Sequence, residues 1–261
     1  MKVVIFCGGQ GTRIQGVADN LPKPMVKIGG KPILWHIMSI YAAYGFKDFV
    51  LCLGHLSWEI KEYFLNYRSM NRDFQVNLSD SSKVSFLNQD PCSDWNVVFA
   101  ETGEDTQTGG RLRKVAPYIQ EDKQVMVTYG DGVSNVNLKE LVDFHNSHGK
   151  AGTITGVRPS GRFGEITYSD KGLINQFNEK PQTEAGRING GFMIFNTKEM
   201  LSYLSTGDQI IFEREPMMNM VADKQLMVYR HNGFWQPMDT HREYKLLNDL
   251  WAKGDAPWKI W

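Results

Sequence analysis

The chain has 261 residues, a length that suits one large α/β domain with a sizeable buried core. Lysine plus arginine and aspartate plus glutamate are balanced at 29 each, so no global positive field favours a nucleic-acid partner or an anionic membrane. Any affinity for phosphate must therefore come from a local cluster of cations and backbone N–H groups.

The cysteines and the apolar runs indicate the compartment. The chain has three cysteines, Cys7, Cys52 and Cys92, an odd number without Cys-x-x-Cys spacing. Two of them lie in apolar, strand-like runs. No signal-like segment precedes the first predicted strand, and no apolar run approaches the ~18 residues of a membrane helix. We expect a soluble protein of the reducing cytoplasm, with no nucleic-acid or membrane partner.

The chain opens on an apolar, β-branched run, residues 2–6, that predicts a buried strand. A glycine turn follows it and allows backbone N–H groups to approach phosphate; its glycines are Gly8, Gly9 and Gly11. A dinucleotide fingerprint would need glycine at Ile14, and a Walker loop would need Gly-Lys-Ser/Thr at residues 16–17, so both motifs are excluded.

Strand and helix patterns alternate through the first half. Residues 33–44 have helical periodicity and stop at Gly45, residues 49–53 form a second apolar strand, and residues 57–67 form a second helix. Further apolar strands follow at 97–99 and 125–129. This alternation predicts a mainly parallel sheet covered by helices on both faces, with ligands at the carboxyl ends of its strands.

The second half has shorter, alternating strands at residues 153–157, 165–168, 173–177 and 192–195. We expect a mixed sheet in one domain of residues 1–261. Residues 1–150 form its first half, and residues 151–261 form its second half with the C-terminal helix.

Residues 70–96 lose the helical periodicity and predict a hairpin. The hairpin is interpreted as a surface insertion, with subunit contact or substrate cover as the functional alternative.

Two cations have neighbours that restrict them. Arg13 follows the glycine turn, where it could neutralise the charge of a phosphate group, and the alternative is an ordinary turn with a surface arginine. Lys23 lies between Pro22 and Pro24, whose rings fix φ and suit a cation held against phosphate. The two cations together favour the phosphate interpretation.

Two aspartates lie where a strand or turn ends. Asp131 follows the strand at 125–129 and has glycine on both sides, which suits a Mg²⁺ ligand; the alternative is an ordinary turn aspartate. Asp239 precedes a capping box at residues 240–243, where the alternative role is to stabilise the helix N-terminus by ~0.3 to 1 kcal/mol.

A pair of histidines and a group of C-terminal tryptophans are interpreted as structural. His145 and His148 have the i, i+3 spacing of a ligand pair, but they end a helix before Gly149, where satisfied or solvent-facing histidines are more common than metal ligands. The tryptophans of the C-terminal region favour packing or an interface over stacking on sugar: Trp235, Trp251, Trp258 and Trp261.

The order of these motifs resembles the sugar-phosphate nucleotidyltransferases, which join a nucleoside triphosphate to a sugar 1-phosphate and release pyrophosphate. The resemblance covers nearly the whole chain and is closest to the members that use CTP and glucose 1-phosphate. Thr108-Gly109-Gly110-Arg111 replaces the Gly-Leu-Ala loop of relatives that use thymidine or uridine nucleotides. The resemblance rests on residues 8–13, 22–25, 29–38, 108–112, 129–133, 233–240 and 256–259.

The resemblance implies a Rossmann-like fold and a role for each matching residue. For the nucleotide it implies Gly8, Gly9, Gly11, Thr12, Arg13, Lys23, Gly109, Gly110 and Arg111. For the sugar phosphate it implies Gly164, Glu179, Lys180 and Asn189. For catalysis it implies Arg13, Lys23, Asp131, Lys180 and Asp239, with Asp131 and Asp239 holding one Mg²⁺ ion.

The resemblance also implies that residues 1–150 are the nucleotide-binding half and that residues 151–261 are the sugar-phosphate-binding half with the C-terminal helix. It further implies substrates and assembly. We expect CTP and glucose 1-phosphate as substrates and a homo-oligomer, with a hexamer among the implied forms. The alternatives are the same chemistry with UTP, dTTP or another sugar 1-phosphate, and an inactive sensor of sugar nucleotides.

Overall fold

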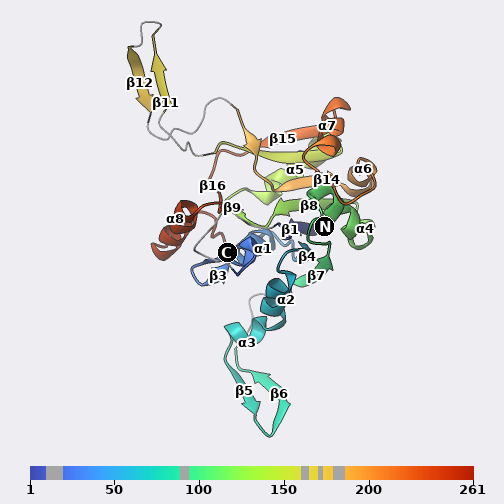
Figure 1. Cartoon of the computed structure of the whole chain (residues 1–261), viewed down its shortest axis with the longest axis vertical. Helices are drawn as coiled ribbons and strands as arrows, with labels where there is room; N and C mark the ends of the chain where they lie inside the picture. Colours follow the sequence, from blue (N-terminus) through green and yellow to red (C-terminus); the bar gives the residue numbers. More distant parts are fainter. Residues whose placement is uncertain (10–19, 89–93, 160–164, 170–172, 179–185) are drawn as a thin grey trace.

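A computed structural model describes residues 1–9, 20–88, 94–159, 165–169, 173–178 and 186–261 of the chain (Figure 1). Its body is a twisted sheet with the strand order β13-β10-β14-β8-β1-β4-β7, and β15 pairs with β10. The strands of this sheet are β1 Lys2–Phe6, β4 Asp48–Leu53, β7 Asn96–Glu101, β8 Gln124–Tyr129, β10 Gly152–Val157, β13 Ile188–Asn189, β14 Met193–Asn196 and β15 Leu226–Arg230.

The strand β1 lies in the centre of the parallel part of the sheet. It pairs in parallel with β4 on one side and β8 on the other, and β4 pairs in parallel with β7. The sheet becomes antiparallel where β14 joins β8 and β10 joins β14. The predicted mixed, mainly parallel sheet is therefore confirmed.

Helices cover both faces of the sheet, as predicted. Alternate residues of β1 point to opposite sides: Val3 and Ile5 lie in one buried cluster, and Val4 and Phe6 lie in the other. The first cluster includes side chains of α1 Ile33–Ala43, α2 Ser57–Leu65, α5 Leu138–His148 and α8 His241–Ala252. The second includes side chains of α4 Thr108–Ile119, α6 Thr197–Ser202 and α7 Glu215–Ala222.

Short elements complete the description. A 3-10 helix spans η1 Lys23–Met25, and the second predicted helix ends in a separate turn, α3 Tyr67–Asn71. Small two-stranded sheets pair β2 Lys27–Ile28 with β3 Lys31–Pro32, β9 Gly132–Ser134 with β16 Trp235–Pro237, and β11 Glu165–Tyr168 with β12 Ile174–Asn178. The elements α6, α7 and β15 lie in a stretch where the sequence analysis placed none.

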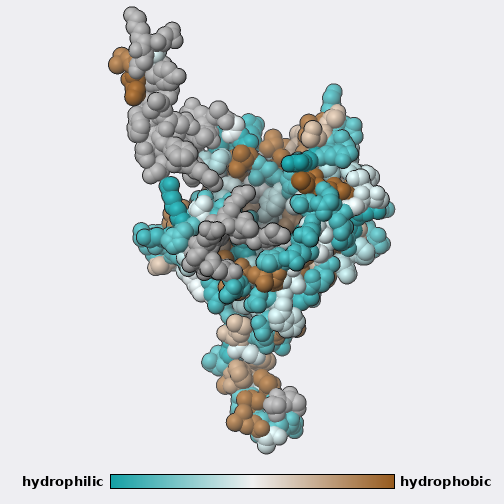
Figure 2. Space-filling model, in the orientation of Figure 1, coloured by the Kyte–Doolittle hydropathy of each residue, from teal (hydrophilic) through white to brown (hydrophobic). Residues whose placement is uncertain are grey.

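The predicted hairpin in residues 70–96 is confirmed by β5 Phe74–Asn77 and β6 Asp80–Phe86. It projects away from the body of the molecule, and Figure 2 shows apolar atoms on it. Its exposed apolar side chains include Phe74, Leu78, Val84 and Leu87. These side chains fit both predicted roles, a surface insertion and a surface for contacts.

Both the histidine pair and the C-terminal tryptophans pack as structural groups. His145 Nδ1 and His148 Nε2 each lie 2.8 Å from Thr153 Oγ1, which ties the end of α5 to β10. Trp258 is fully buried, and its indole N–H donates to His36 Nδ1 over 3.4 Å. Among the described residues, no helix combines the length and the apolar character that crossing a membrane requires.

The His36 side chain predicts how stability depends on pH. His36 is fully buried, its Nε2 lies 2.8 Å from Ile28 O, and burial lowers its pKa to about 4. The unfolded chain therefore binds a proton near pH 6.5 that the folded chain does not bind until about pH 4, so stability falls as the pH decreases through this window.

We expect His36 to account for about 2 kcal/mol of the stability lost between pH 7.5 and pH 5. Urea unfolding of His36→Gln at both pH values should show a difference smaller by that amount. The exposed His241, replaced as His241→Gln, serves as the control and should keep the wild-type difference. An unchanged difference in His36→Gln would contradict the assignment.

Candidate active site

A pocket of about 670 Å³ opens at the carboxyl ends of the parallel strands. The turn after β1 contributes Gly8 and Gly9, the turn after β8 contributes Asp131, and residues 104–108 between β7 and α4 form another wall. Lys23 and Asp239 come from other parts of the chain to line the same pocket. The volume is within the range typical of small-molecule sites.

The two predicted aspartates meet in this pocket because two short strands pair beside it. In the β9–β16 ladder Gly132 pairs with Pro237, and the backbone N–H of Met238 donates to Asp131 O over 2.8 Å. This ladder places the residue before β9 next to the residues after β16. Asp131 and Asp239, far apart in the sequence, therefore face each other.

The start of α8 fixes the backbone of Asp239. Glu243 Oε2 accepts from the N–H groups of Asp239 and Thr240 over 2.7 and 2.9 Å, and Thr240 caps the helix. The predicted capping box is confirmed, and it holds the loop that carries Asp239.

The Lys23 ammonium bridges the two aspartates. Its Nζ donates to Asp131 Oδ2 over 2.6 Å and also to Asp239 Oδ1. Burial by itself would lower the pKa of Lys23, but the two carboxylates outweigh this effect and raise it above its usual value. The side chain is thus a fixed positive charge, and η1 holds its backbone through the Met25 N–H bond to Pro22 O.

The carboxylates of Asp131 and Asp239 already converge on one cation, the Lys23 ammonium. Mg²⁺ in phosphate-transfer sites takes one or two carboxylates and completes its shell with phosphate oxygens and water. Among the described residues, no group of three or more His, Cys, Asp or Glu side chains is placed to hold a metal. This pair of carboxylates fits the donor set that Mg²⁺ requires.

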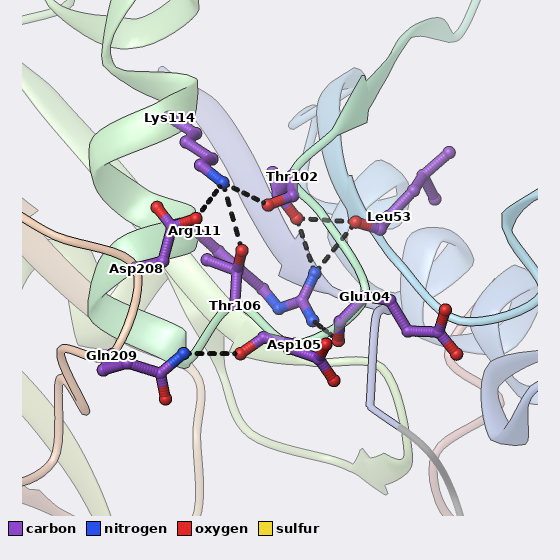
Figure 3. A network of polar contacts seen from close by, with 9 residues as sticks. All are labelled: Leu53, Thr102, Glu104, Asp105, Thr106, Arg111, Lys114, Asp208 and Gln209. Carbon is purple, nitrogen blue, oxygen red and sulfur yellow. Dashed lines mark hydrogen bonds and ion pairs between the residues drawn. The ribbon is translucent and has the colours of Figure 1, made fainter.

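The Arg111 side chain is buried and ties three strand ends together, and Figure 3 shows its bonds to Leu53, Thr102 and Glu104. Its Nη1 donates to Leu53 O over 2.8 Å and to Thr102 Oγ1 over 2.5 Å. Its Nη2 donates to Gly8 O over 2.9 Å and to Glu104 O over 3.2 Å. The guanidinium therefore joins the last residue of β4 to the segments that follow β1 and β7, while it also lines the pocket. A contact between Arg111 and phosphate stays a prediction.

Lys114, one helical turn after Arg111, supports the same wall of the pocket. Its Nζ donates to Thr102 O, Thr106 Oγ1 and Asp208 Oδ2 over 2.9, 3.1 and 2.7 Å. Gln209 adds a bond from its Nε2 to Asp105 O, which Figure 3 also shows. These residues were not predicted from the sequence. The spacing of Lys114 from Arg111 was a signal for the lysine, but nothing in the sequence indicated the segment around residue 208.

Gly109 and Gly110 begin α4 beside that segment. The N–H groups of both donate to Ile210 O, over 2.8 and 3.2 Å. A Cβ atom on Gly109 would lie 2.6 Å from Ile210 Cγ2, and one on Gly110 would lie 2.6 Å from Asp208 O. The glycines allow this close packing, and their contact with a nucleotide stays a prediction.

Asn189, expected in the sugar-phosphate site, contacts the end of β8. Its Nδ2 donates to Tyr129 OH over 3.2 Å, and the Tyr129 hydroxyl donates to Glu213 Oε1 over 2.6 Å. Burial, followed by the Glu213 carboxylate, raises the pKa of Tyr129, so its hydroxyl stays protonated.

Several predicted site residues lie outside the described residues. They are Gly11, Thr12, Arg13, Gly164, Glu179 and Lys180. Their roles stay predictions.

Comparisons with known proteins show which family the chain resembles. The model of the nucleotidyl transferase family matches residues 2–245. A glucose-1-phosphate cytidylyltransferase of Salmonella typhi is 44% identical over 262 residues, which cover 100% of both sequences. A mannose-1-phosphate guanyltransferase of Gibberella zeae is 28% identical, over 97% of this chain and 66% of that protein.

A solved structure supports the fold alone. HddC from Yersinia pseudotuberculosis, complexed with GMP-PN, is similar with a TM-score of 0.66 and 22% identity, over 96% of this chain and 99% of that chain.

The four hydrogen bonds of Arg111 predict a large effect on stability. Arg111→Lys should lower the free energy of unfolding by at least about 2 kcal/mol, because one ammonium cannot reach all of these buried acceptors. Urea unfolding measures this loss. Arg113→Lys, an exposed position on the same helix, is the control and should leave stability nearly unchanged. A variant of Arg111 that kept full stability and only raised the KM for nucleotide would indicate a ligand contact instead.

Proposed function

Because the chain belongs to the nucleotidyl transferase family, we propose that it transfers a cytidylyl group from CTP to glucose 1-phosphate, giving CDP-glucose and pyrophosphate. The observation that carries this proposal is the 44% identity with a glucose-1-phosphate cytidylyltransferase over the full length of both chains. The two aspartates and the lysine in the pocket supply groups that this reaction needs.

In the proposed reaction, a phosphate oxygen of glucose 1-phosphate attacks the α-phosphorus of CTP. The bond between that phosphorus and the oxygen bridging to the β-phosphate breaks, and pyrophosphate leaves with the electron pair. No covalent enzyme intermediate is needed, so the protein contributes mainly position and charge. The Lys23 ammonium, which lies beside both carboxylates, would provide a positive charge against the triphosphate.

We propose Mg²⁺ as the cofactor, held by Asp131 and Asp239. When bound, the ion would neutralise charge on the phosphate oxygens of the nucleotide. The pair of carboxylates, brought together by the β9–β16 ladder, supports this assignment.

The division into two substrate halves is also a proposal. Residues 1–150 supply the glycine turn, Lys23 and Asp131, while residues 151–261 supply Asn189 and Asp239. Asp239 belongs to the pocket of the first half, so the second half also completes the proposed metal site.

A homo-oligomer, the assembly implied by the resemblance, is a further part of the proposal. The hairpin β5–β6 supports it, because it leaves the body of the molecule and carries exposed apolar side chains.

The substrate assignment predicts a preference for CTP. Pyrophosphate release should be measured with CTP, UTP, dTTP, ATP and GTP, each with glucose 1-phosphate and Mg²⁺, and with EDTA as the control. We expect CTP to react at least ~tenfold faster than the others, a difference of about 1.4 kcal/mol in the transition state. Preference for another nucleotide would change the base assignment. Absence of release with every nucleotide and sugar 1-phosphate would instead favour a sensor of sugar nucleotides.

The shared metal site predicts that each aspartate matters by itself. Asp131→Asn and Asp239→Asn should each lower Mg²⁺-dependent kcat by at least about a hundredfold, because each removes one anionic ligand. Kinetics over a range of Mg²⁺ concentrations measures the effect, and Asp249→Asn, a change far along α8, is the control. Unchanged Mg²⁺ dependence in both site variants would show that the pair does not hold the ion.

A further inference from the structure

The Glu213 carboxylate joins two parts of the proposed site that come from different elements. Its Oε1 accepts from the Tyr129 hydroxyl at the end of β8, and its Oε2 accepts from the Thr108 hydroxyl at the start of α4, both over 2.6 Å. Tyr129 and Thr108 line the pocket. Glu213 lies just before α7, in a stretch where sequence patterns gave no indication of a site.

The hydrogen bonds around Glu213 run in one consistent direction. Thr108 Oγ1 accepts from the N–H of Phe212 over 2.9 Å, which leaves its own hydrogen for the carboxylate. Tyr129 OH accepts from Asn189 Nδ2 over 3.2 Å and likewise donates its hydrogen to the carboxylate. Each hydroxyl is therefore oriented by a donor on one side and by Glu213 on the other.

The same arrangement orients the Asn189 amide. Its Oδ1 accepts from the N–H of Gly191 over 3.0 Å, so its Nδ2 is the atom that faces Tyr129. A Cβ atom on Gly191 would lie 3.1 Å from Tyr129 Cδ2, so glycine lets this turn approach the tyrosine ring closely. The chain of bonds thus runs from Asn189 through Tyr129 and Glu213 to Thr108.

We propose that Glu213 is a positioning residue that fixes the nucleotide side of the pocket relative to its sugar side. The inference rests on the proposed function, in which α4 borders the nucleotide and Asn189 reads the sugar phosphate. In-line transfer needs the attacking oxygen and the α-phosphorus at a fixed separation, and small misplacements reduce the rate strongly. A carboxylate that accepts hydrogen bonds from both sides fixes their relative position at a half-buried point.

The test is a double-mutant cycle with separate KM values for the two substrates. Glu213→Gln should raise both KM values about tenfold, because an amide cannot accept from both hydroxyls. Tyr129→Phe should raise mainly the KM for glucose 1-phosphate, and Thr108→Val should raise mainly the KM for CTP. In the Tyr129→Phe background, Glu213→Gln should then raise the KM for CTP but add little to the KM for glucose 1-phosphate.

The control is Glu215→Gln, an exposed glutamate at the start of α7, which should leave both KM values unchanged. If Glu213→Gln changes both KM values by the same factor in every background, the residue acts only on the general stability of the pocket and the proposal is wrong. Unchanged KM values in Glu213→Gln would also overturn it.

The activity of the wild-type chain with different substrates tests the proposed function separately. If it prefers another nucleotide or sugar phosphate, the substrate assignment is revised, and the cycle is measured with the preferred pair. The coupling through Glu213 is then upheld or rejected by the same pattern of KM values.

Discussion

The pocket depends on one buried guanidinium that has carbonyl and hydroxyl oxygens as its partners. Arg111 reaches from α4 to the end of β4 and to the segments that follow β1 and β7, and it donates to one or two oxygens in each. Parallel strands end at one edge of the sheet, where the irregular segments that follow need hydrogen-bond donors for their carbonyl groups. Thr102 supplies two such donors to Leu53 O, and Arg111 supplies others. A planar side chain with several fixed donors satisfies these carbonyls at once, which a lysine could not do.

The rest of the pocket is formed by segments that are distant in the sequence. The β9–β16 ladder brings Asp131 and Asp239 together, and Lys23 from a proline-restricted turn lies between them. The segment before α7 adds Glu213, which bonds α4 and β8. The strands thus supply the frame, while long-range hydrogen bonds define the geometry of the pocket.

The sequence predicted the parts of the fold that depend on local pattern. The apolar runs at β1, β4 and β8 and the hairpin β5–β6 were placed correctly, because strand periodicity and turn residues are local signals. The stretch from α6 to β15 was missed, since its elements are short and their apolar faces become evident only against the sheet. At the site, Lys23 and Asp131 had local signals. The hydrogen bonds of Arg111 and the position of Glu213 between α4 and β8 depend on tertiary contacts that no local sequence pattern indicates.

The Lys23 ammonium between two carboxylates prepares the proposed metal site before a metal binds. Two aspartates this close would repel each other without a cation, and their loops would tend to separate. Because the protein carries its own counterion, Asp131 and Asp239 are held together before any ligand arrives. In the proposed metal site, binding of the ion would exchange one positive partner for another on a prearranged pair of carboxylates, and Lys23 would then be free to contact phosphate.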